Sequence, residues 1–286
     1  MRIIANRKIF YIISIVLLLP GIVSLFMQGI NTGIDFIGGT SLSYQIAEAT
    51  EVAEVRQVLL ESGVDKDFQV QQSDGVYYLR SLMLSQEEID QLTASLAEVW
   101  PDVELLRSDS VGAAIGKEIT TDAFLSVLIA CLAILIYISL RFKWDYGVAS
   151  VLALLHNVLF VLGIFSIFQW EINSPFIAAI LTVVGYTIND TIVVFDRLRE
   201  NMANRSRKED YASLVDISVG QTINRSINTV LTCLMPLIAL LLLSGSESTI
   251  GTFVLAMILG FSVGAYTSLC IATSWWYEIK SRTKAA

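Results

Sequence analysis

Six apolar runs dominate this chain, and each is about long enough to cross a hydrocarbon core of roughly 30 Å. Inside a bilayer the backbone has no water to bond, so isolated apolar runs of this length must be helical. The sequence therefore predicts a membrane bundle of six transmembrane helices. The runs are Ile9–Met27, Ala123–Leu140, Tyr146–Phe168, Phe176–Phe195, Ile227–Leu243 and Ile250–Tyr277.

The segment between the first two runs has a different composition. Residues 30–118 hold 16 acidic and 5 basic residues, whereas the rest of the chain holds 11 acidic and 14 basic residues. An acidic block flanked by apolar runs indicates a water-exposed domain. The same charge argues against nucleic acid as a partner, because phosphate is bound by Lys and Arg.

Charge alternates along the connections between the runs. Basic residues lie at both termini, in the loop carrying Arg141 and Lys143, and in the Arg197–Lys208 loop, whereas loops 169–175 and 244–249 carry none. By the positive-inside rule, both termini and the Arg197–Lys208 loop are cytoplasmic, and the acidic block lies outside. The predicted divisions are 1–29 (tail and first helix), 30–118 (extracytoplasmic domain), 119–278 (five-helix bundle) and 279–286 (cytoplasmic tail). An interfacial helix that joins the fourth and fifth runs is predicted over Asp210–Gln221.

The acidic block has a readable pattern of strands and helices. Its order, β-α-β-β-α-β, is that of the ferredoxin-like α+β fold, an antiparallel sheet with two helices on one face. Ser85 and Glu88 fit a capping box. The predicted elements are Thr40–Ile46, Glu51–Ser62, Phe68–Gln72, Val76–Leu82 (after the turn Ser73–Gly75), Ser85–Trp100 and Val103–Ser108.

Asp190 is the residue that points to a function. It lies inside the fourth run, where a carboxylate costs roughly 3 kcal/mol on insertion scales. Such a group usually faces a bundle interior, pairing with a cation or carrying protons. Arg225, at the entry of the next run, is the obvious cation, although a snorkelling interfacial charge is an equal alternative from the residues alone. Asn189 and Thr187 are placed to hold a water beside the carboxylate.

The remaining polar residues of the runs suggest structural roles. His156 is expected to hydrogen bond across helices, with Asn157 or another polar neighbour. Gly260 and Gly264 form a GxxxG pattern that predicts close helix packing. Asp196, Arg197 and Glu200 are expected to pair locally. The three cysteines form no metal or disulfide pattern, and no catalytic constellation, metal site or cofactor site is predicted.

Four motifs occur in order along nearly the whole chain. Together they resemble the SecF side of the bacterial SecD/SecF family of protein-export membrane proteins, within the resistance–nodulation–division superfamily. The run from Gly185 to Arg197 is the most specific of the four, with Thr187 and Ser226 as departures that keep a hydroxyl. The motifs are Gly33-Ile34-Asp35-Phe36-Ile37-Gly38-Gly39, Ser110–Glu118, Gly185–Arg197 and Asn224-Arg225-Ser226-Ile227-Asn228-Thr229.

The resemblance implies a non-enzymatic subunit of the Sec translocase in the cell inner (plasma) membrane. It would work with SecD beside the SecYEG channel, using the proton motive force to help an exported preprotein cross. It also implies that Arg225 takes part with Asp190 in proton-driven cycling. The junction motif (Gly33, Asp35, Phe36, Gly38 and Gly39) reads as a tight turn that couples domain motion to helix motion. The alternatives are a small-molecule or ion transporter of the same superfamily and a scaffold that stabilises the channel without transport.

Overall fold

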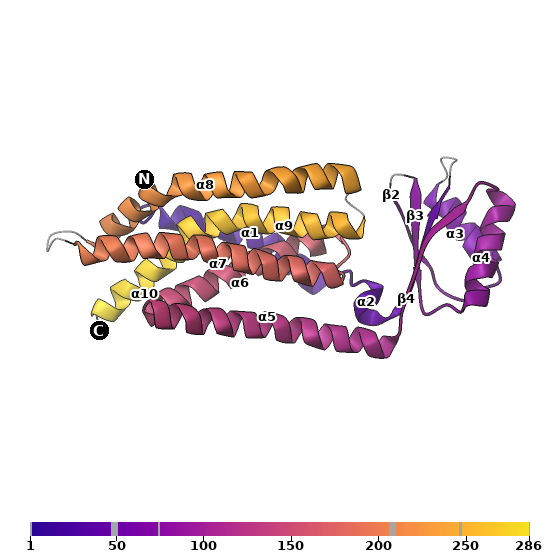
Figure 1. Cartoon of the computed structure of the whole chain (residues 1–286), viewed down its shortest axis with the longest axis horizontal. Coiled ribbons are helices and arrows are strands. Elements are labelled where there is room, and N and C mark those ends of the chain that lie inside the picture. Colours follow the sequence, from indigo (N-terminus) through magenta and orange to yellow (C-terminus); the bar gives the residue numbers. More distant parts are fainter. Residues whose placement is uncertain (1, 47–50, 74, 206–209, 246–247, 286) are drawn as a thin grey trace. The chain divides into compact units, whose positions relative to one another are not determined.

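The structure is a computed structural model that describes residues 2–46, 51–73, 75–205, 210–245 and 248–285. It divides into two compact units, one formed by Met1–Asn31 with Leu125–Ala286 and the other by Thr32–Phe124 (Figure 1). The first contains the apolar helices and the second contains the sheet.

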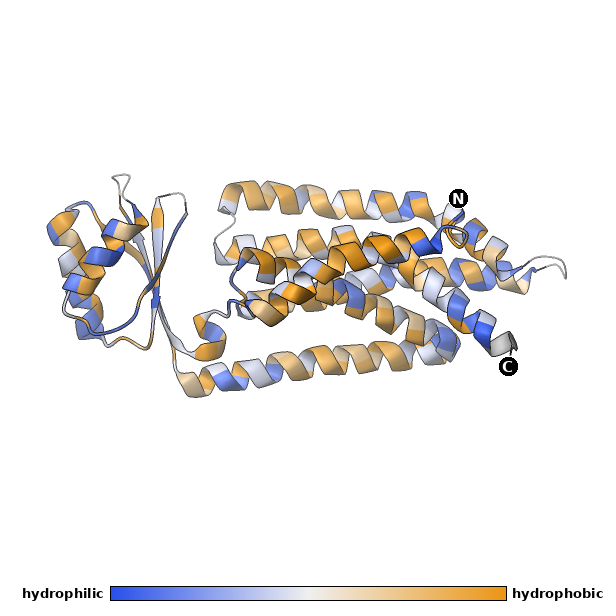
Figure 2. Ribbon diagram, turned by 180° about the vertical axis from the view of Figure 1, so that it is seen from behind, coloured by the Kyte–Doolittle hydropathy of each residue, from blue (hydrophilic) through white to orange (hydrophobic). Residues whose placement is uncertain are grey.

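Six helices of the described chain are long and apolar enough to cross a membrane, as predicted. Figure 2 shows them apolar over most of their length, with hydrophilic residues concentrated toward the helix ends. The chain is therefore a multi-pass membrane protein. The spans are α1 (Arg7–Met27), α5 (Ala113–Arg141), α6 (Trp144–Phe168), α7 (Ser174–Ala203), α8 (Tyr211–Ser244) and the run of α9 (Thr249–Tyr266), the π-helix η1 (Thr267–Ala272) and α10 (Thr273–Ala285).

The predicted helix over Asp210–Gln221 is observed, but it is continuous with the fifth span. Those residues form the first turns of α8, which continues unbroken into the fifth span. Asp210 caps this helix by accepting a hydrogen bond from the Ser213 amide at 2.9 Å. Because no proline occurs between Tyr211 and Pro236, nothing in the backbone ends the helix at the membrane boundary.

The spans differ in how deeply they are buried. Half of the apolar window of α7 is buried, but only 6 % of that of α5. Close contacts between helices use glycine: a Cβ on Gly21 of α1 would lie 2.7 Å from the Cα of Gly163 on α6. Helices α6, α7 and α9 thus contribute most of the buried interior, and the candidate site lies there.

The second unit contains one four-stranded sheet with the order β2-β3-β1-β4, in which every neighbouring pair is antiparallel. The predicted succession of strands and helices is observed, with ends shifted by a few residues, and the turn residue Asp74 lies outside the described residues. A short helix that was not predicted, α2, precedes it. The elements are α2 (Ile34–Ile37), β1 (Gly39–Gln45), α3 (Val52–Glu61), β2 (Gln69–Ser73), β3 (Val76–Ser81), α4 (Gln86–Val99) and β4 (Glu104–Val111).

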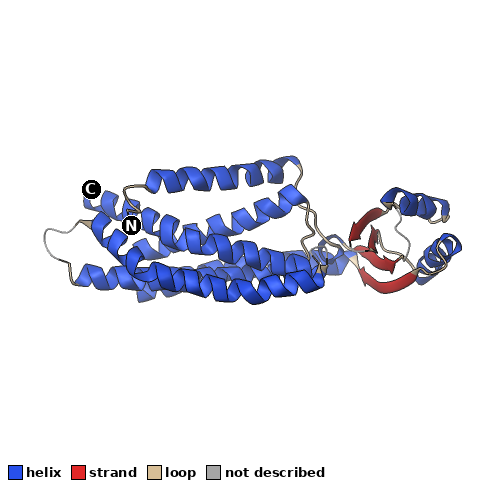
Figure 3. Cartoon of the chain, turned by 90° about the horizontal axis from the view of Figure 1, so that it is seen from above, coloured by secondary structure: helices blue, strands red, loops and turns tan. Residues whose placement is uncertain are grey.

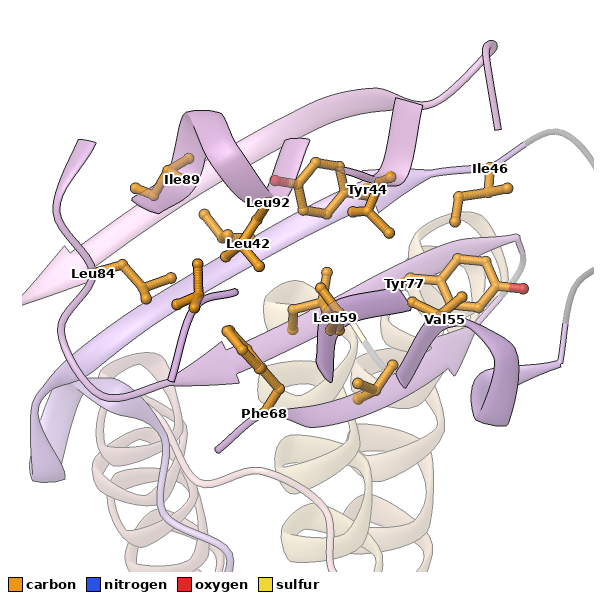
Figure 4. Close-up of a cluster of buried hydrophobic side chains, with 14 of the residues drawn as sticks. Leu42, Tyr44, Ile46, Val55, Leu59, Phe68, Tyr77, Leu84, Ile89 and Leu92 are labelled. Carbon is orange, nitrogen blue, oxygen red and sulfur yellow. The ribbon is translucent and has the colours of Figure 1, made fainter. Parts of the chain in front are cut away.

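Both α3 and α4 cover the same face of the sheet (Figure 3). Alternate residues of the central strands point to that face, among them Leu42 and Tyr44 of β1 and Tyr77 of β3, each at most 1 % exposed (Figure 4). They pack against Leu59 of α3 and Leu92 of α4. The unit therefore has a hydrophobic core of its own.

Candidate functional site

Asp190 lies inside the bundle, as predicted from the apolar run that contains it. Helix α7 is started by Asn173, whose side chain accepts a hydrogen bond from the Phe176 amide at 3.1 Å. Asp190 follows on the buried face of this helix and is 9 % exposed. Its Oδ1 accepts a hydrogen bond from the Ser226 hydroxyl of α8 at 2.6 Å. That length is typical of a hydroxyl bound to a carboxylate.

Hydroxyl groups from three helices line the surroundings of the carboxylate. Besides Ser226, they come from Thr187 and Thr191 of α7 and from Ser268 of η1, all at most 1 % exposed. The hydroxyls of Thr191 and Ser268 lie 2.8 Å apart, and the Ser268 hydroxyl is also close to the Asp190 carboxylate. The π-helix places Ser268 here, and such segments occur frequently at functional sites.

Asn157 of α6 extends this polar cluster. Its amide donates to the Thr187 hydroxyl at 2.8 Å and to the carbonyl of Gly260 at 3.2 Å. The GxxxG pattern makes the approach possible, because a Cβ on Gly264 would lie 2.6 Å from Thr187 Oγ1. The close packing predicted for these glycines is confirmed. Two side-chain oxygens in the cluster, Asp190 Oδ2 and Asn157 Oδ1, have no hydrogen-bond partner among the described residues.

The predicted neighbours of Asp190 are only partly brought together. Thr187 lies in the cluster, but Asn189 is exposed, one residue and about 100° of helical rotation from Asp190. Asn189 therefore lies outside the cluster, and the buried amide near the site belongs to Asn157. Sequence reasoning missed Ser226 and Ser268 as neighbours because serine is common in transmembrane helices and carries no distinguishing pattern.

Arg225 does not pair with Asp190. No ion pair joins them in the described part of the chain, and the contact is made instead by the next residue, Ser226. Arg225 is exposed and lines a cavity of about 390 Å³ between α5, α7 and α8. It remains close enough for its charge to act on the carboxylate. The predicted direct pairing is thus replaced by a hydroxyl contact with a cation nearby.

The local charge pairs beyond the site differ slightly from expectation. Arg197 pairs with Glu200 at 2.6 Å, as predicted, but Asp196 pairs with Arg199 at 2.8 Å and not with Arg197. His156 lies 3.4 Å from the Thr267 hydroxyl through Nδ1, so Thr267 is the polar neighbour with which the predicted hydrogen bond across helices is made. In the described ranges no group of three or more metal-ligating side chains comes together.

The glycine-rich junction motif lies in the second unit and is not a simple turn. Gly33 caps the one-turn helix α2, and Gly38 follows it with a φ of 78°. A Cβ on Gly38 would lie 2.7 Å from the Cα of Ala113, and one on Gly116 would lie 2.8 Å from the carbonyl oxygen of Phe36. Glycine is therefore needed here both for its backbone conformation and for close packing of α2 on the first turns of α5.

Gly39 and Asp35 complete the motif. Gly39 has a φ of 139° and opens β1, pairing with Val111 of β4. Asp35 lies in α2 and is half-buried. The motif thus joins α2, the sheet and the start of α5 within a few residues.

The sequence of this chain is similar to those of a known protein family. A profile described as "Protein export membrane protein SecD/SecF, C-terminal" matches residues 91–282. The "Protein translocase subunit SecF" of Acidaminococcus fermentans is 39% identical, over 99% of this chain and 98% of its own length. That of Sebaldella termitidis is 36% identical, over 98% of this chain and 92% of its own length.

The fold of this chain is also similar to that of a solved structure from the same group of proteins. The crystal structure of SecDF, a translocon-associated membrane protein from Thermus thermophilus, superposes with a TM-score of 0.90 at 35% identity. The match covers 98% of this chain and 39% of that protein. The chain therefore belongs to the SecD/SecF family of protein export membrane proteins.

Proposed function

We propose that this chain is an accessory subunit of the Sec protein translocase that, together with SecD, uses the proton motive force to promote protein export through SecYEG. Its relatives are translocase subunits in name, which supports the translocase role. The single observation that carries the proton step is the buried Asp190 carboxylate, held on one oxygen by Ser226 and without a described partner on the other.

Asp190 has the properties required of a proton carrier. A charged carboxylate at this depth is costly, and one hydrogen bond offsets only part of that cost. A proton on Oδ2 removes the charge without disturbing the Ser226 bond to Oδ1. The carboxylate can therefore take up a proton while Ser226 still holds Oδ1.

Helix α8 has two adjacent residues, Arg225 and Ser226, that could each face Asp190. Successive residues of a helix differ by about 100° in direction, so a rotation of α8 would exchange Ser226 for Arg225 beside Asp190. The charged carboxylate would favour the arginine, and the protonated form would favour the hydroxyl. One elementary charge crossing 100 mV supplies about 2.3 kcal/mol, which is enough to bias such a two-state element.

An exposed polar surface supports SecD as the partner. Asn189 of α7 and Asn228 and Thr232 of α8 are exposed, although they lie in membrane-spanning segments. Polar side chains are unfavourable against lipid tails and favourable between helices. The SecDF protein of Thermus thermophilus, 39% identical over 96% of this chain, is longer and is matched over 38% of its length. A partner with its own helices would cover this surface.

The sheet-containing unit is the proposed extracytoplasmic domain, with a ferredoxin-like arrangement. The antiparallel order β2-β3-β1-β4 with two helices on one face supports that fold. The placement outside the inner membrane, with both termini cytoplasmic, rests on the alternation of basic residues between the loops. There the domain would meet the emerging preprotein. The packing of α2 on α5 supports a role for Gly33, Asp35, Phe36, Gly38 and Gly39 in transmitting helix motion to the domain.

The test is the substitution Asp190→Asn, which keeps the size of the side chain and removes the titratable proton. Export of a reporter is measured in inverted vesicles containing this chain, its partner and the channel, with and without a proton gradient. The matched control is Asp196→Asn, the same change on the same helix at a residue that is paired with Arg199 outside the cluster.

Asp190→Asn is expected to assemble normally and to lose the gradient-dependent part of export, whereas Asp196→Asn keeps it. Arg225→Ala is expected to fail in the same way, and the double substitution to add little, because both residues act on one switch. If Asp190→Asn responds to the gradient like the parent, the carboxylate is structural. Repeating the assay with a sodium gradient identifies the coupling ion.

A further inference from the structure

We propose that the cavity between α5, α7 and α8 binds the phosphate of an anionic phospholipid headgroup. The cavity has a volume of about 390 Å³, within the usual range for small-molecule sites. Three arginines line it, one from each helix: Arg141, Arg197 and Arg225. This inference rests on the chain spanning a membrane and does not depend on proton coupling.

The cavity carries an excess of positive charge that the described chain does not neutralise. Its two acidic residues are already paired, Asp196 with Arg199 at 2.8 Å and Glu200 with Arg197 at 2.6 Å. Together with Arg199, the partner of Asp196 outside the lining, the three lining arginines outnumber the two carboxylates by two and leave a net charge of +2. No ion pair of Arg141 or Arg225 occurs among the described residues. An anion is therefore the expected occupant.

Phosphate is the anion that fits these side chains best. The guanidinium group presents a planar fork of N–H donors that binds phosphate oxygens in pairs. Arg141 lies at the end of α5 and Arg225 near the middle of α8, so the two approach the cavity from different helices. Gln221 and Thr222 of α8 add uncharged polar groups to the lining.

The apolar part of the lining indicates a lipid as the source of the phosphate. Tyr137 of α5 and Ile192 and Val193 of α7 lie about one helical turn deeper in their spans than Arg141 and Arg197. Four residues of helix correspond to about 6 Å, a distance comparable to the step from headgroup to acyl chain. A free phosphate ion has no group to place there, whereas a lipid does. Basic pockets between transmembrane helices bind anionic headgroups in this manner.

The test is lipid retention by the purified full chain, measured by native mass spectrometry. Phosphatidylglycerol and phosphatidylcholine with identical acyl chains are titrated separately, and inorganic phosphate is added as a competitor. The variant is Arg141→Gln, which removes one unpaired cation and leaves the proposed coupling residues unchanged. The matched control is Arg282→Gln. Arg282 is an exposed arginine on α10 and does not line the cavity.

The parent is expected to bind phosphatidylglycerol in preference to phosphatidylcholine. Arg141→Gln should weaken phosphatidylglycerol binding by on the order of tenfold, since a charge-assisted hydrogen-bond pair is lost. Arg141→Lys should recover only part of it, because lysine keeps the charge and not the fork. Arg282→Gln should bind like the parent.

Three results would overturn the inference. One is unchanged phosphatidylglycerol binding in Arg141→Gln, with helicity confirming that the variant is folded. The other is displacement of the lipid by inorganic phosphate at equal concentration, which would make this a site for the free ion. Equal binding of both lipids in the parent would show that acyl chains alone are recognised, and would also exclude the headgroup site.

Discussion

Substituting Gly260 by alanine tests whether close packing of α9 on α7 holds the candidate site together. A Cβ at this position would lie 2.5 Å from Cγ1 and 3.0 Å from Cβ of Val183, with Cγ2 also within van der Waals overlap. Valine in a helix has essentially one side-chain rotamer, so rotation cannot relieve the overlap. The two helices must therefore move apart beside Thr187 and Asn157.

The expected magnitude follows from two opposing effects. Overpacking a buried site destabilises by typically 1–3 kcal/mol, and a contact with three carbons of a rigid side chain belongs at the upper end, about 3 kcal/mol. Replacing glycine by alanine in a helix contributes about 1 kcal/mol in the opposite direction. Gly260→Ala should thus be destabilised by about 2 kcal/mol relative to the parent.

The matched control is Gly185→Ala on α7, where a Cβ would meet nothing within 4 Å. This variant keeps the helix-propensity gain without the overlap, so its stability should match or exceed that of the parent by up to about 1 kcal/mol. The free energy of unfolding is measured for each variant by following helicity in mixed detergent micelles of increasing denaturing detergent content.

A compensating variant decides the mechanism. Adding Val183→Ala to Gly260→Ala removes both Cγ atoms and should recover part of the lost stability, so the two changes are non-additive. An equal free energy of unfolding for Gly260→Ala and Gly185→Ala would show that the overlap with Val183 costs nothing. The overlap is also excluded as the cause if Val183→Ala lowers the free energy of unfolding of Gly260→Ala by as much as it lowers that of the parent.

Three further predictions concern the sheet-containing unit and topology. A hydrogen bond from Lys66 and the Ser85 amide lower the pKa of Glu88 from 4.5 to about 2, so its contribution to stability is full above pH 4.5 and lost as the pH falls toward 2. A 32–124 fragment should fold alone, because it contains its own core, and its melting temperature is therefore expected to fall over this pH range. The fall should be smaller in Glu88→Gln. An equal dependence of melting temperature on pH in the two proteins contradicts the prediction. Gly39→Ala in the same fragment should cost at least about 1 kcal/mol by denaturant unfolding, because φ is 139° there, and an unchanged midpoint would show that the junction tolerates a side chain. A cysteine substituted for Glu98 should react with a membrane-impermeant reagent only from the extracytoplasmic side. A cysteine substituted for Ser206, a position that is not among the described residues, should react only from the cytoplasmic side. The reverse pattern would invert the proposed orientation.

Features that depend on neighbours along the chain were predictable from the sequence. The six spans follow from hydropathy, and the capping box of Ser85 and Glu88 is observed as predicted. The burial of Asp190 was also predictable, because a carboxylate in an apolar run has few alternatives to a bundle interior. The helix predicted over Asp210–Gln221 proved to be the start of α8, because hydropathy marks where a helix enters the membrane and not where its backbone ends.

The neighbours of Asp190 were decided only by the tertiary structure. Ser226 is 36 residues away along the chain, and Ser268 is brought to the site by a π-helix that the sequence does not signal. Asn189 and Arg225 precede Asp190 and Ser226, the two residues joined by the hydrogen bond, yet both are exposed and take no part in it. The reason is geometric: hydropathy locates a helix within the membrane, but its rotation about its own axis depends on how it packs against the others. A rotation of about 100° changes which residue faces Asp190 without changing the composition of the span.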